Sequence, residues 1–305
     1  MSSESGSSLS LHSILSPVDF SEQSRQALRW AAAFAARFRS GLTVVSVVDP
    51  LLAEVARIRW HQDLVRAGTE PALREFVAAT WPDGPGLSQQ MVFTTPVGDP
   101  AATILGTATT AGADLIVMGT RGLGGLQKWL LGSTTERVLR RTRVPVLAVP
   151  LANESHAAPE AGMVSRILAA TDFSESSVVA AKTAAHLARV FSATLTLSHI
   201  VEPVTVPTQW QPLVDESGET RVADARARLQ SMAAQIADPG KGDTVLATGR
   251  PEELIGSLAE ERGAHMIVMG LASDQGPFSP RPGSIAYRVL CSTTIPVLVV
   301  PASHG

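Results

Sequence analysis

An internal repeat constrains the fold of this 305-residue chain more than any other feature of its sequence. The tetrapeptide DFSE stands at Asp19–Glu22 and again at Asp172–Glu175. The apolar segment Val144–Leu147 (VPVL) is repeated with one change at Ile295–Leu298 (IPVL). The landmarks keep the same order, with a spacing of about 150 residues, which is the size that a single hydrophobic core supports. The chain is therefore predicted to contain two similar domains in tandem.

The composition of the segments between the repeats predicts the domain boundaries. Residues 1–10 are polar and rich in serine, and they are predicted to form a disordered tail, not a signal peptide. The first domain is predicted over residues 11–151 and the second over residues 163–303. Residues 152–162, rich in Ala, Pro, Glu and Ser, are predicted to form the linker between them.

The overall composition is that of an ordinary globular protein, with 45% hydrophobic and 17% charged residues. Without a membrane span or a signal peptide, a cytoplasmic location is expected. A single cysteine excludes an intramolecular disulfide and a multi-cysteine metal site. The net charge of −3 gives no support for binding to nucleic acid, which normally requires a basic domain.

Each half alternates segments of strand and helix composition. In the first half, strands are predicted at 11–18, 42–48, 90–94, 114–118 and 146–149, and helices at 21–39, 51–80, 100–111 and from 133 onward. Such alternation implies parallel strands joined by right-handed crossovers, with helices on both faces. The predicted fold class is α/β, with two tandem, doubly wound, open parallel sheets.

Unusual residues follow several of the predicted strands. Asp19 follows the first strand, Asp49 the second, and Gly119 opens a glycine-rich loop after the fourth. In open sheets of this type, ligands bind beyond the carboxyl ends of the strands, where the strand order reverses. If the first and fourth strands are neighbours, Asp19 and the Gly119 loop face each other across one crevice.

The glycine-rich loop contains Gly119, two residues, Gly122, nine residues, then Gly132 and Ser133. It is not a Walker A motif, because Lys128 is flanked by Gln127 and Trp129. It is not a Rossmann fingerprint either, because the turn after the first strand has no glycine. Glycines at fixed spacing after an apolar strand allow the backbone to approach phosphate oxygens closely.

This spacing resembles that of the universal stress proteins, whose nucleotide-binding members carry Gly, two residues, Gly, nine residues, then Gly and Ser or Thr. The resemblance covers nearly the whole chain in two copies and implies adenine nucleotide alpha hydrolase-like domains with five-stranded sheets. It also implies ATP, accompanied by Mg²⁺ or Mn²⁺, as the ligand of the first domain. The phosphates would rest on backbone N–H groups of the loop and of Gly132 and Ser133. The implied binding residues are Pro17, Val18, Asp19, Val47, Met118, Gly119, Arg121, Gly122, Gly132, Ser133 and Thr134; no catalytic residue or protein-held metal site is implied.

Several of these residues have simpler structural interpretations. The segment Ser133–Glu136 (STTE) matches a capping box, which needs no ligand. Asp19 fits the role of a cap for the first helix, since Asp172 occupies the same place in the second half. Arg121 is either a solvated side chain or a phosphate clamp.

The second half departs from the glycine pattern. Ser273 replaces the second glycine, and three prolines lie between it and Gly283, although Gly270 and Ser284 are retained. Prolines remove N–H donors and stiffen the backbone. The second domain is therefore predicted to have weak or no nucleotide binding. His199, at the end of a strand, is more simply structural than ligand-binding.

The sequence favours a nucleotide-binding regulatory protein of the stress response, in which ATP changes the order of the loop between Gly119 and Gly132. One alternative is a slow ATP hydrolase or nucleotidyl-transferring enzyme, and another is an adaptor that binds no nucleotide. In the family that the chain resembles, domains dimerise through the last strand, so 145–149 and 296–300 are candidates for an internal pseudo-dimer or a homodimer. Protein partners are expected, and nucleic acid and membranes are not.

Overall fold

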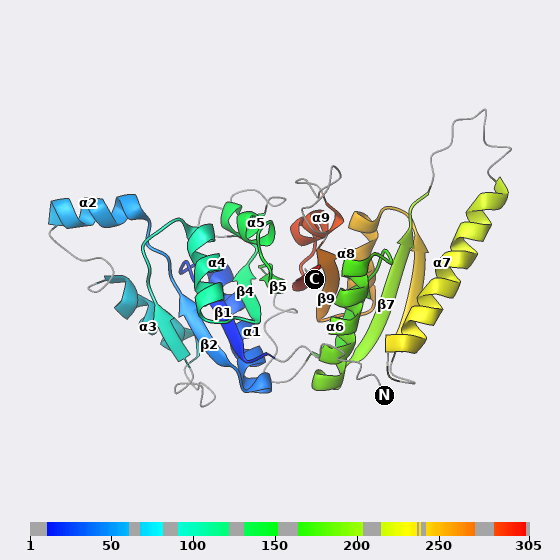
Figure 1. Ribbon diagram of the computed structural model, residues 1–305, viewed down its shortest axis with the longest axis horizontal. Helices are drawn as coiled ribbons and strands as arrows, with labels where there is room; N and C mark the ends of the chain where they lie inside the picture. The colour runs from blue at the N-terminus through cyan, green and yellow to red at the C-terminus, as the bar shows by residue number, and fades with distance from the viewer. Residues whose placement is uncertain are drawn as a thin grey trace, which may run out of the picture. The chain divides into compact units, whose positions relative to one another are not determined.

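The computed structural model describes residues 11–60, 68–81, 91–121, 131–151, 164–203, 215–236, 238, 242–271 and 284–302. These residues fall into two compact units, one within Ser10–Met163 and the other within Val164–Gly305 (Figure 1). The predicted tail and linker lie outside the described residues, as does Gly122.

The first unit alternates strands and helices along its described length. Its elements are β1 (Ser13–Pro17), α1 (Glu22–Phe38), β2 (Gly41–Val45), α2 (Pro50–Trp60), α3 (Glu70–Thr80), β3 (Met91–Thr94), α4 (Pro100–Thr110), β4 (Leu115–Gly119), α5 (Ser133–Leu139) and β5 (Val146–Val149). The described strands lie in the order β3-β2-β1-β4-β5, and each neighbouring pair is parallel. The order reverses between β1 and β4, which are neighbours. This is the condition under which Asp19 and the Gly119 loop were predicted to flank one crevice.

The second unit repeats this arrangement. Its elements are β6 (Arg166–Ala170), α6 (Glu175–Phe191), β7 (Thr194–Val201), α7 (Asp215–Ile236), β8 (Gly242–Thr248), α8 (Pro251–Glu261), β9 (Met266–Leu271), α9 (Ile285–Ser292) and β10 (Val297–Pro301). The described strands of this unit follow the order β8-β7-β6-β9-β10, again with parallel neighbours. Helices lie on both faces of each sheet (Figure 1), which confirms the predicted doubly wound α/β class.

Local sequence explains the first helix of each unit. The side chain of Ser21 accepts a hydrogen bond from the N–H of Ser24 at the start of α1, and that of Ser174 accepts one from Ser177 at the start of α6. A cap of this kind contributes about 1 kcal/mol. Both helices bury a stripe rich in alanine, which lets them lie close to the sheet.

The central strands are buried on both faces. All five residues of β4 are buried, as are all four of β5. β1 is joined to β4 at their N-terminal ends by the carboxylate of Asp114, which accepts hydrogen bonds from the N–H groups of His12 at 2.7 Å and Ser13 at 3.0 Å. This contact links segments about 100 residues apart in the chain.

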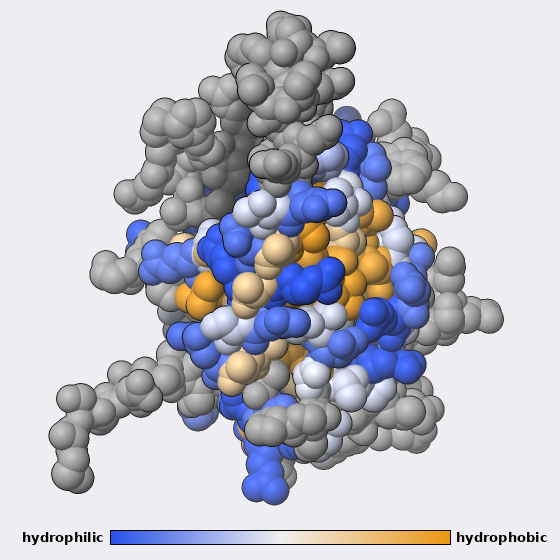
Figure 2. All heavy atoms as spheres, turned by 90° about the vertical axis from the view of Figure 1, so that its right-hand side faces the viewer, coloured by the Kyte–Doolittle hydropathy of each residue, from blue (hydrophilic) through white to orange (hydrophobic). Residues whose placement is uncertain are grey.

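The two units differ after their second strands. The predicted helical stretch 51–80 contains two described helices, α2 and α3, whereas the second unit has one long helix, α7. Figure 2 faces the side on which α7 and the edge strand β8 lie, where hydrophobic residues show among hydrophilic ones. In β8, Val245, Leu246 and Ala247 are only half-buried.

No helix among the described residues is long and apolar enough to cross a membrane.

Candidate functional site

The residues predicted to bind nucleotide lie at the carboxyl ends of β1, β2 and β4 and at the start of α5. β1 and β4 are neighbours in the sheet, so Asp19 and Gly119 flank the same reversal of strand order. This is the position at which open α/β sheets bind ligands. The side chains of Val18 and Met118 are each 4% exposed and belong to the core, so these two residues offer a ligand mainly their backbone atoms.

The end of β2 is fixed by backbone hydrogen bonds beyond the strand itself. The N–H of Val18 donates to the carbonyl of Val45 at 2.8 Å, and Val48 forms an isolated parallel bridge with Val97. Val48 is buried, whereas Val47 and Pro17 are half-buried. Of the apolar residues predicted at this edge, Pro17 and Val47 therefore keep side-chain surface available to a ligand.

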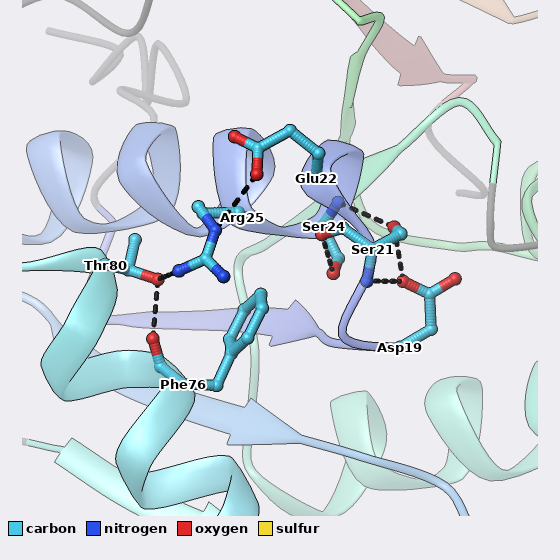
Figure 3. Close-up of polar contacts among 7 residues, drawn as sticks. All are labelled: Asp19, Ser21, Glu22, Ser24, Arg25, Phe76 and Thr80. Atoms are coloured by element: carbon cyan, nitrogen blue, oxygen red, sulfur yellow. Dashed lines mark hydrogen bonds and ion pairs between the residues drawn. The ribbon is translucent and has the colours of Figure 1, made fainter.

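Asp19 orients the start of α1 without capping it. Its Oδ1 accepts hydrogen bonds from the N–H of Ser21 at 3.1 Å and from the Ser21 hydroxyl at 2.6 Å (Figure 3). Ser21 is the residue that caps α1, so the simpler interpretation of Asp19 as the cap is wrong. The side chain of Asp19 is half-buried.

Phe20, which lies between Asp19 and Ser21, adopts a left-handed backbone with φ of 63°, and its side chain is 36% exposed. Its ring meets that of Phe76 edge to face, with 5.6 Å between the centroids. The Arg25 guanidinium lies 4.2 Å from the Phe76 ring centroid and donates to the Thr80 hydroxyl at 2.9 Å (Figure 3). This cluster ties α3 to the start of α1. The sequence analysis missed it, because the contacts join residues more than fifty positions apart.

The base of the glycine-rich loop is closed by backbone hydrogen bonds. The N–H of Gly132 donates to the carbonyl of Thr120 at 2.8 Å, and the N–H of Thr120 donates to Val149 at 2.9 Å. The sequence analysis assigned both N–H groups to phosphate, whereas in the structure each donates to a backbone carbonyl. An anion bound at this loop would therefore need N–H donors other than those of Thr120 and Gly132. Arg121, which leaves the base of the loop, is half-buried.

Gly119 and Gly132 also lie in tightly packed places inside the protein. A Cβ on Gly119 would lie 3.1 Å from Cβ of Gln23, and one on Gly132 would lie 3.2 Å from Cα of Arg121. Both distances are shorter than ordinary van der Waals contact. The two glycines thus allow α1 and the loop base to approach each other closely, which is a role that does not depend on a ligand.

The start of α5 differs from its prediction. Its N-cap is Gly132, which has no side chain to cap the helix, and Ser133 is the first helical residue. The predicted capping box is therefore wrong: Glu136 pairs with Arg140 at 2.6 Å instead of reaching back. The first N–H groups of a helix have no partner within it, and no side chain caps those at the start of α5, where Ser133 and Thr134 stand. The Ser133 side chain is exposed and that of Thr134 half-buried.

Thr135, which was not predicted, connects the helix to the strand before the loop. It is 3% exposed, and its hydroxyl donates to the carbonyl of Gly119 at 2.8 Å. Ala286 occupies the corresponding place in the second domain and has no hydroxyl. The third residue of the STTE segment was the available signal, but only the fold shows which carbonyl it meets.

In the second domain, the corresponding helix caps itself. Ser284, the counterpart of Ser133, is the N-cap of α9, and its hydroxyl accepts a hydrogen bond from the N–H of Tyr287 at 3.4 Å. In the first domain, Ser133 is not the cap but the first residue of helix α5. Ser273 and Gly283 lie outside the described residues.

Gly270 is retained in the second domain for a packing reason. A Cβ on it would lie 2.6 Å from the carbonyl carbon of Ser176 and 2.7 Å from the nitrogen of Ser177. Ser176 stands where the first domain has the larger Gln23, so the helix backbone comes closer to the strand. Retention of this glycine is therefore no sign of a phosphate site.

Three side chains gather at the carboxyl ends of β6 and β7 and on α7 in the second domain. The rings of Phe173 and His199 lie 4.4 Å apart, and the Arg228 guanidinium lies 4.3 Å from the Phe173 ring centroid. His199 Nδ1 lies 2.7 Å from the carbonyl of Thr171, so this nitrogen is the donor. His199 thus has a structural role here, as expected.

Burial acts to raise the pKa of Asp172, but hydrogen bonds from the Ser174 hydroxyl and N–H outweigh it and hold the pKa below its ordinary value. The Asp172 carboxylate thus accepts hydrogen bonds within its own turn, as the Asp19 carboxylate does in the first domain.

An ion pair joins the helices on either side of the first-domain loop. Arg137 of α5 donates to Asp99, the N-cap of α4, at 2.7 and 2.8 Å. In the second domain Arg250 replaces Asp99, and Arg288 pairs with Glu252 at 2.7 Å. In both domains an arginine of the helix after the loop thus pairs with an acidic residue at the start of the preceding helix, but the acidic residue differs.

The described residues contain no group of three or more His, Cys, Asp or Glu side chains suited to hold a metal ion.

Comparison with known proteins decides the family. The model of the universal stress protein family matches residues 11–150 and again residues 163–301. The chain belongs to the universal stress protein family. A universal stress protein of Mycolicibacterium smegmatis is 28% identical over 298 residues, which cover 95% of this chain and 97% of that protein. One from Methanocaldococcus jannaschii is 34% identical over 142 residues, covering 45% of this chain and 80% of the relative.

Solved structures of universal stress proteins share the fold along the whole tandem chain. The crystal structure of a universal stress protein from Archaeoglobus fulgidus has a TM-score of 0.66 at 22% identity and covers 97% of this chain and 100% of its own. The structure of a putative universal stress protein from Pseudomonas aeruginosa has a TM-score of 0.67 at 18% identity, covering 96% and 94%. These likenesses establish the universal stress protein fold for both halves.

Proposed function

We propose that the first domain binds ATP at the crevice between β1 and β4, and that occupancy regulates the surface that this domain presents to protein partners. The observation that carries the proposal is a difference between the domains. The complete glycine motif of the first domain leads into a helix whose cap, Gly132, has no side chain, whereas the second domain caps the corresponding helix with Ser284.

Different parts of the site contact the phosphates, the base and the ribose of ATP. The phosphates lie against the N–H groups and hydroxyls of Ser133 and Thr134, with Gly119, Gly122 and Gly132 shaping the loop around them. Adenine and ribose lie toward Pro17 and Val47, with Asp19 as the polar anchor. Mg²⁺ or Mn²⁺ accompanies the phosphates, because hard cations prefer oxygen ligands.

Binding would change the order of the loop between Gly119 and Gly132, and this change is what a partner detects. The second domain, with its self-capped helix, serves as the partner of the first and binds nucleotide weakly or not at all. The role in the stress response, the cytoplasmic location and any pairing of domains through their last strands remain predictions from the sequence.

Isothermal titration of nucleotide-free protein with Mg-ATP tests the proposal. Wild type is compared with Gly132→Ser, which supplies the hydroxyl cap that the second domain has, and with Gly132→Ala. The alanine variant is the matched control, because both changes add a Cβ at the same place and only serine adds a competing acceptor. We expect about one site per chain and an affinity about tenfold lower for G132S than for G132A, the size of one hydrogen bond to a charged group.

Two further readings complete the test. Ser284→Gly, which uncaps the second helix, is expected to leave the titration unchanged. Phosphate release measured in the same samples decides the alternative of a slow ATP hydrolase. The proposal would be overturned if nucleotide-free wild type showed no heat of binding with ATP, ADP, AMP or cyclic AMP. The nucleotide-independent adaptor would then be the favoured function.

A further inference from the structure

Helix α2 turns its large apolar side chains away from its own domain. Leu51, Leu52, Val55 and Ile58, which we call the α2 stripe, are 78%, 53%, 46% and 59% exposed. The residues that face the domain are small: Ala56 is fully buried and Ala53 half-buried. An amphipathic surface helix normally shows the opposite arrangement, with its large apolar residues in the core.

The α2 stripe is a local feature of the molecule. Half of the large hydrophobic side chains exposed in the described part of the chain belong to it, four of eight, and none of the eight lies in the described part of the second domain. Its residues are three and four positions apart, so they form one continuous surface along the helix. Figure 1 shows α2 at the edge of the first domain, on the side where α3 lies. A contiguous exposed apolar surface of this kind indicates an interaction site.

The charges beside the stripe are arranged so that the helix complements a reversed copy of itself. Acidic residues occupy its first half, with Asp49 as the cap that accepts from the N–H groups of Leu51 and Leu52, followed by Glu54. Basic residues, Arg57 and Arg59, occupy the second half, and within one helix Arg57 pairs with Glu54 at 2.7 Å. In an antiparallel pair, the acidic half of each helix lies beside the basic half of the other, whereas a parallel pair would place like charges together.

We propose that the α2 stripe is the contact surface for a second copy of this chain, with the two helices antiparallel about a twofold axis near Val55. This pairing brings Leu52 of each copy against Ile58 of the other and Val55 against its own mate. The contact is isologous, so it closes after two chains and does not propagate. A single pair of short helices buries less area than a standard stable interface, and the association is therefore weak and reversible.

The charge of the helix argues against a membrane as the occupant. α2 carries two arginines and one glutamate, and the whole chain has a net charge of −3. Peripheral helices that bind anionic lipid carry a strongly basic polar face, which this helix lacks.

The proposal is tested by sedimentation velocity of the full chain over a concentration series from about 1 to 300 μM, a range that spans weak protein association. Wild type is expected to shift reversibly from monomer toward dimer. Ile58→Glu and Leu52→Glu are each expected to raise the dimer Kd at least about tenfold, the usual effect of disrupting a central interface residue. Val92→Glu is the matched control: Val92 is 58% exposed on β3, outside the stripe, and its replacement is expected to leave the association unchanged.

A cross-linking experiment tests the twofold axis independently. In a Cys291→Ala background, Val55→Cys is expected to form a disulfide-linked dimer on mild oxidation, whereas Val92→Cys is not. Circular dichroism of every variant verifies that the fold is intact. A wild type that stays monomeric throughout the series overturns the proposal, as does a dimer that I58E and L52E leave unchanged. Co-sedimentation of wild type with anionic vesicles of phosphatidylserine and phosphatidylcholine, lost in I58E, would assign the stripe to a membrane instead.

Discussion

Substitution of Gly270 by alanine should destabilise the second domain far more than substitution of Gly119 by alanine destabilises the first. Alanine at Gly270 would place its Cβ within 2.6–2.8 Å of three backbone atoms of Ser176 and Ser177, so the first turn of α6 must move. Overpacking of this kind costs typically about 1–3 kcal/mol, and contact with backbone puts it at the upper end. Replacing glycine also returns about 0.4–1 kcal/mol by restricting the unfolded chain. The expected net loss is about 2 kcal/mol, which lowers the melting temperature of a domain of this size by roughly 4–8 °C.

At Gly119 the same change is much milder. The nearest atoms, in Gln23 and Arg121, would lie at 3.1–3.3 Å, so a displacement of a few tenths of an ångström relieves the contact. The entropic gain offsets this cost, and the net effect is expected to be within about 0.5 kcal/mol of zero. Differential scanning calorimetry measures both variants in the full chain.

Two glycines within helices provide the controls. No heavy atom lies within 4 Å of a Cβ on Gly106 in α4, and a Cβ on Gly256 in α8 meets Thr293 at an ordinary 3.8 Å. Alanine at either position is expected to stabilise its domain by about 0.5–1 kcal/mol. If G270A proves as mild as G119A, the packing explanation for Gly270 is wrong, and its retention in the second domain would need a ligand-based reason.

Two further predictions concern the frame of the first-domain site. Thr135→Val should cost about 1–2 kcal/mol in urea unfolding, because it removes the buried hydroxyl that donates to Gly119; a neutral result would show that the contact contributes nothing. The hydrogen bonds from Arg137 and then from the N–H of Ala102 lower the pKa of Asp99 below its ordinary value of 3.8. The stability that this ion pair adds is therefore present above that value and is lost as pH falls through the lowered pKa. The difference in melting temperature between wild type and Asp99→Asn should stay constant from about pH 8 to 5 and shrink toward pH 3, with Arg137→Gln behaving alike; a difference that grows on acidification would contradict the assignment.

The sequence predicted the order of elements well because its signals are local. Apolar β-branched runs and helix caps lie within a few residues of each other, and β5 was predicted with the bounds that the structure shows, Val146–Val149. The second strand was predicted three residues too long, to Val48. It ends at Val45, and beyond it Val48 forms a single isolated bridge to Val97.

The site was less predictable because its decisive features depend on helix registers and distant contacts. The STTE segment fits a capping box, yet α5 begins one residue earlier than that pattern requires, with Gly132 as its cap. The role of Thr135 depends on a carbonyl sixteen residues away. The glycines were interpreted as space for phosphate, but the structure shows that Gly119 and Gly270 make room for the first turns of α1 and α6. That role is set by the size of Gln23 and Ser176, which no local pattern reveals.

The contact between Asp114 and the backbone of His12 and Ser13 has a consequence for the synthesis of this protein. The first strand leaves the ribosome about 100 residues before the strand that must lie beside it. At roughly 5–20 residues per second, one edge of β1 waits about 5–20 seconds for its neighbour. The second domain repeats the delay, because β6 pairs with β9 across a similar interval. Each nascent domain therefore exposes an apolar strand edge for seconds, which makes it a substrate for chaperones that bind extended apolar segments.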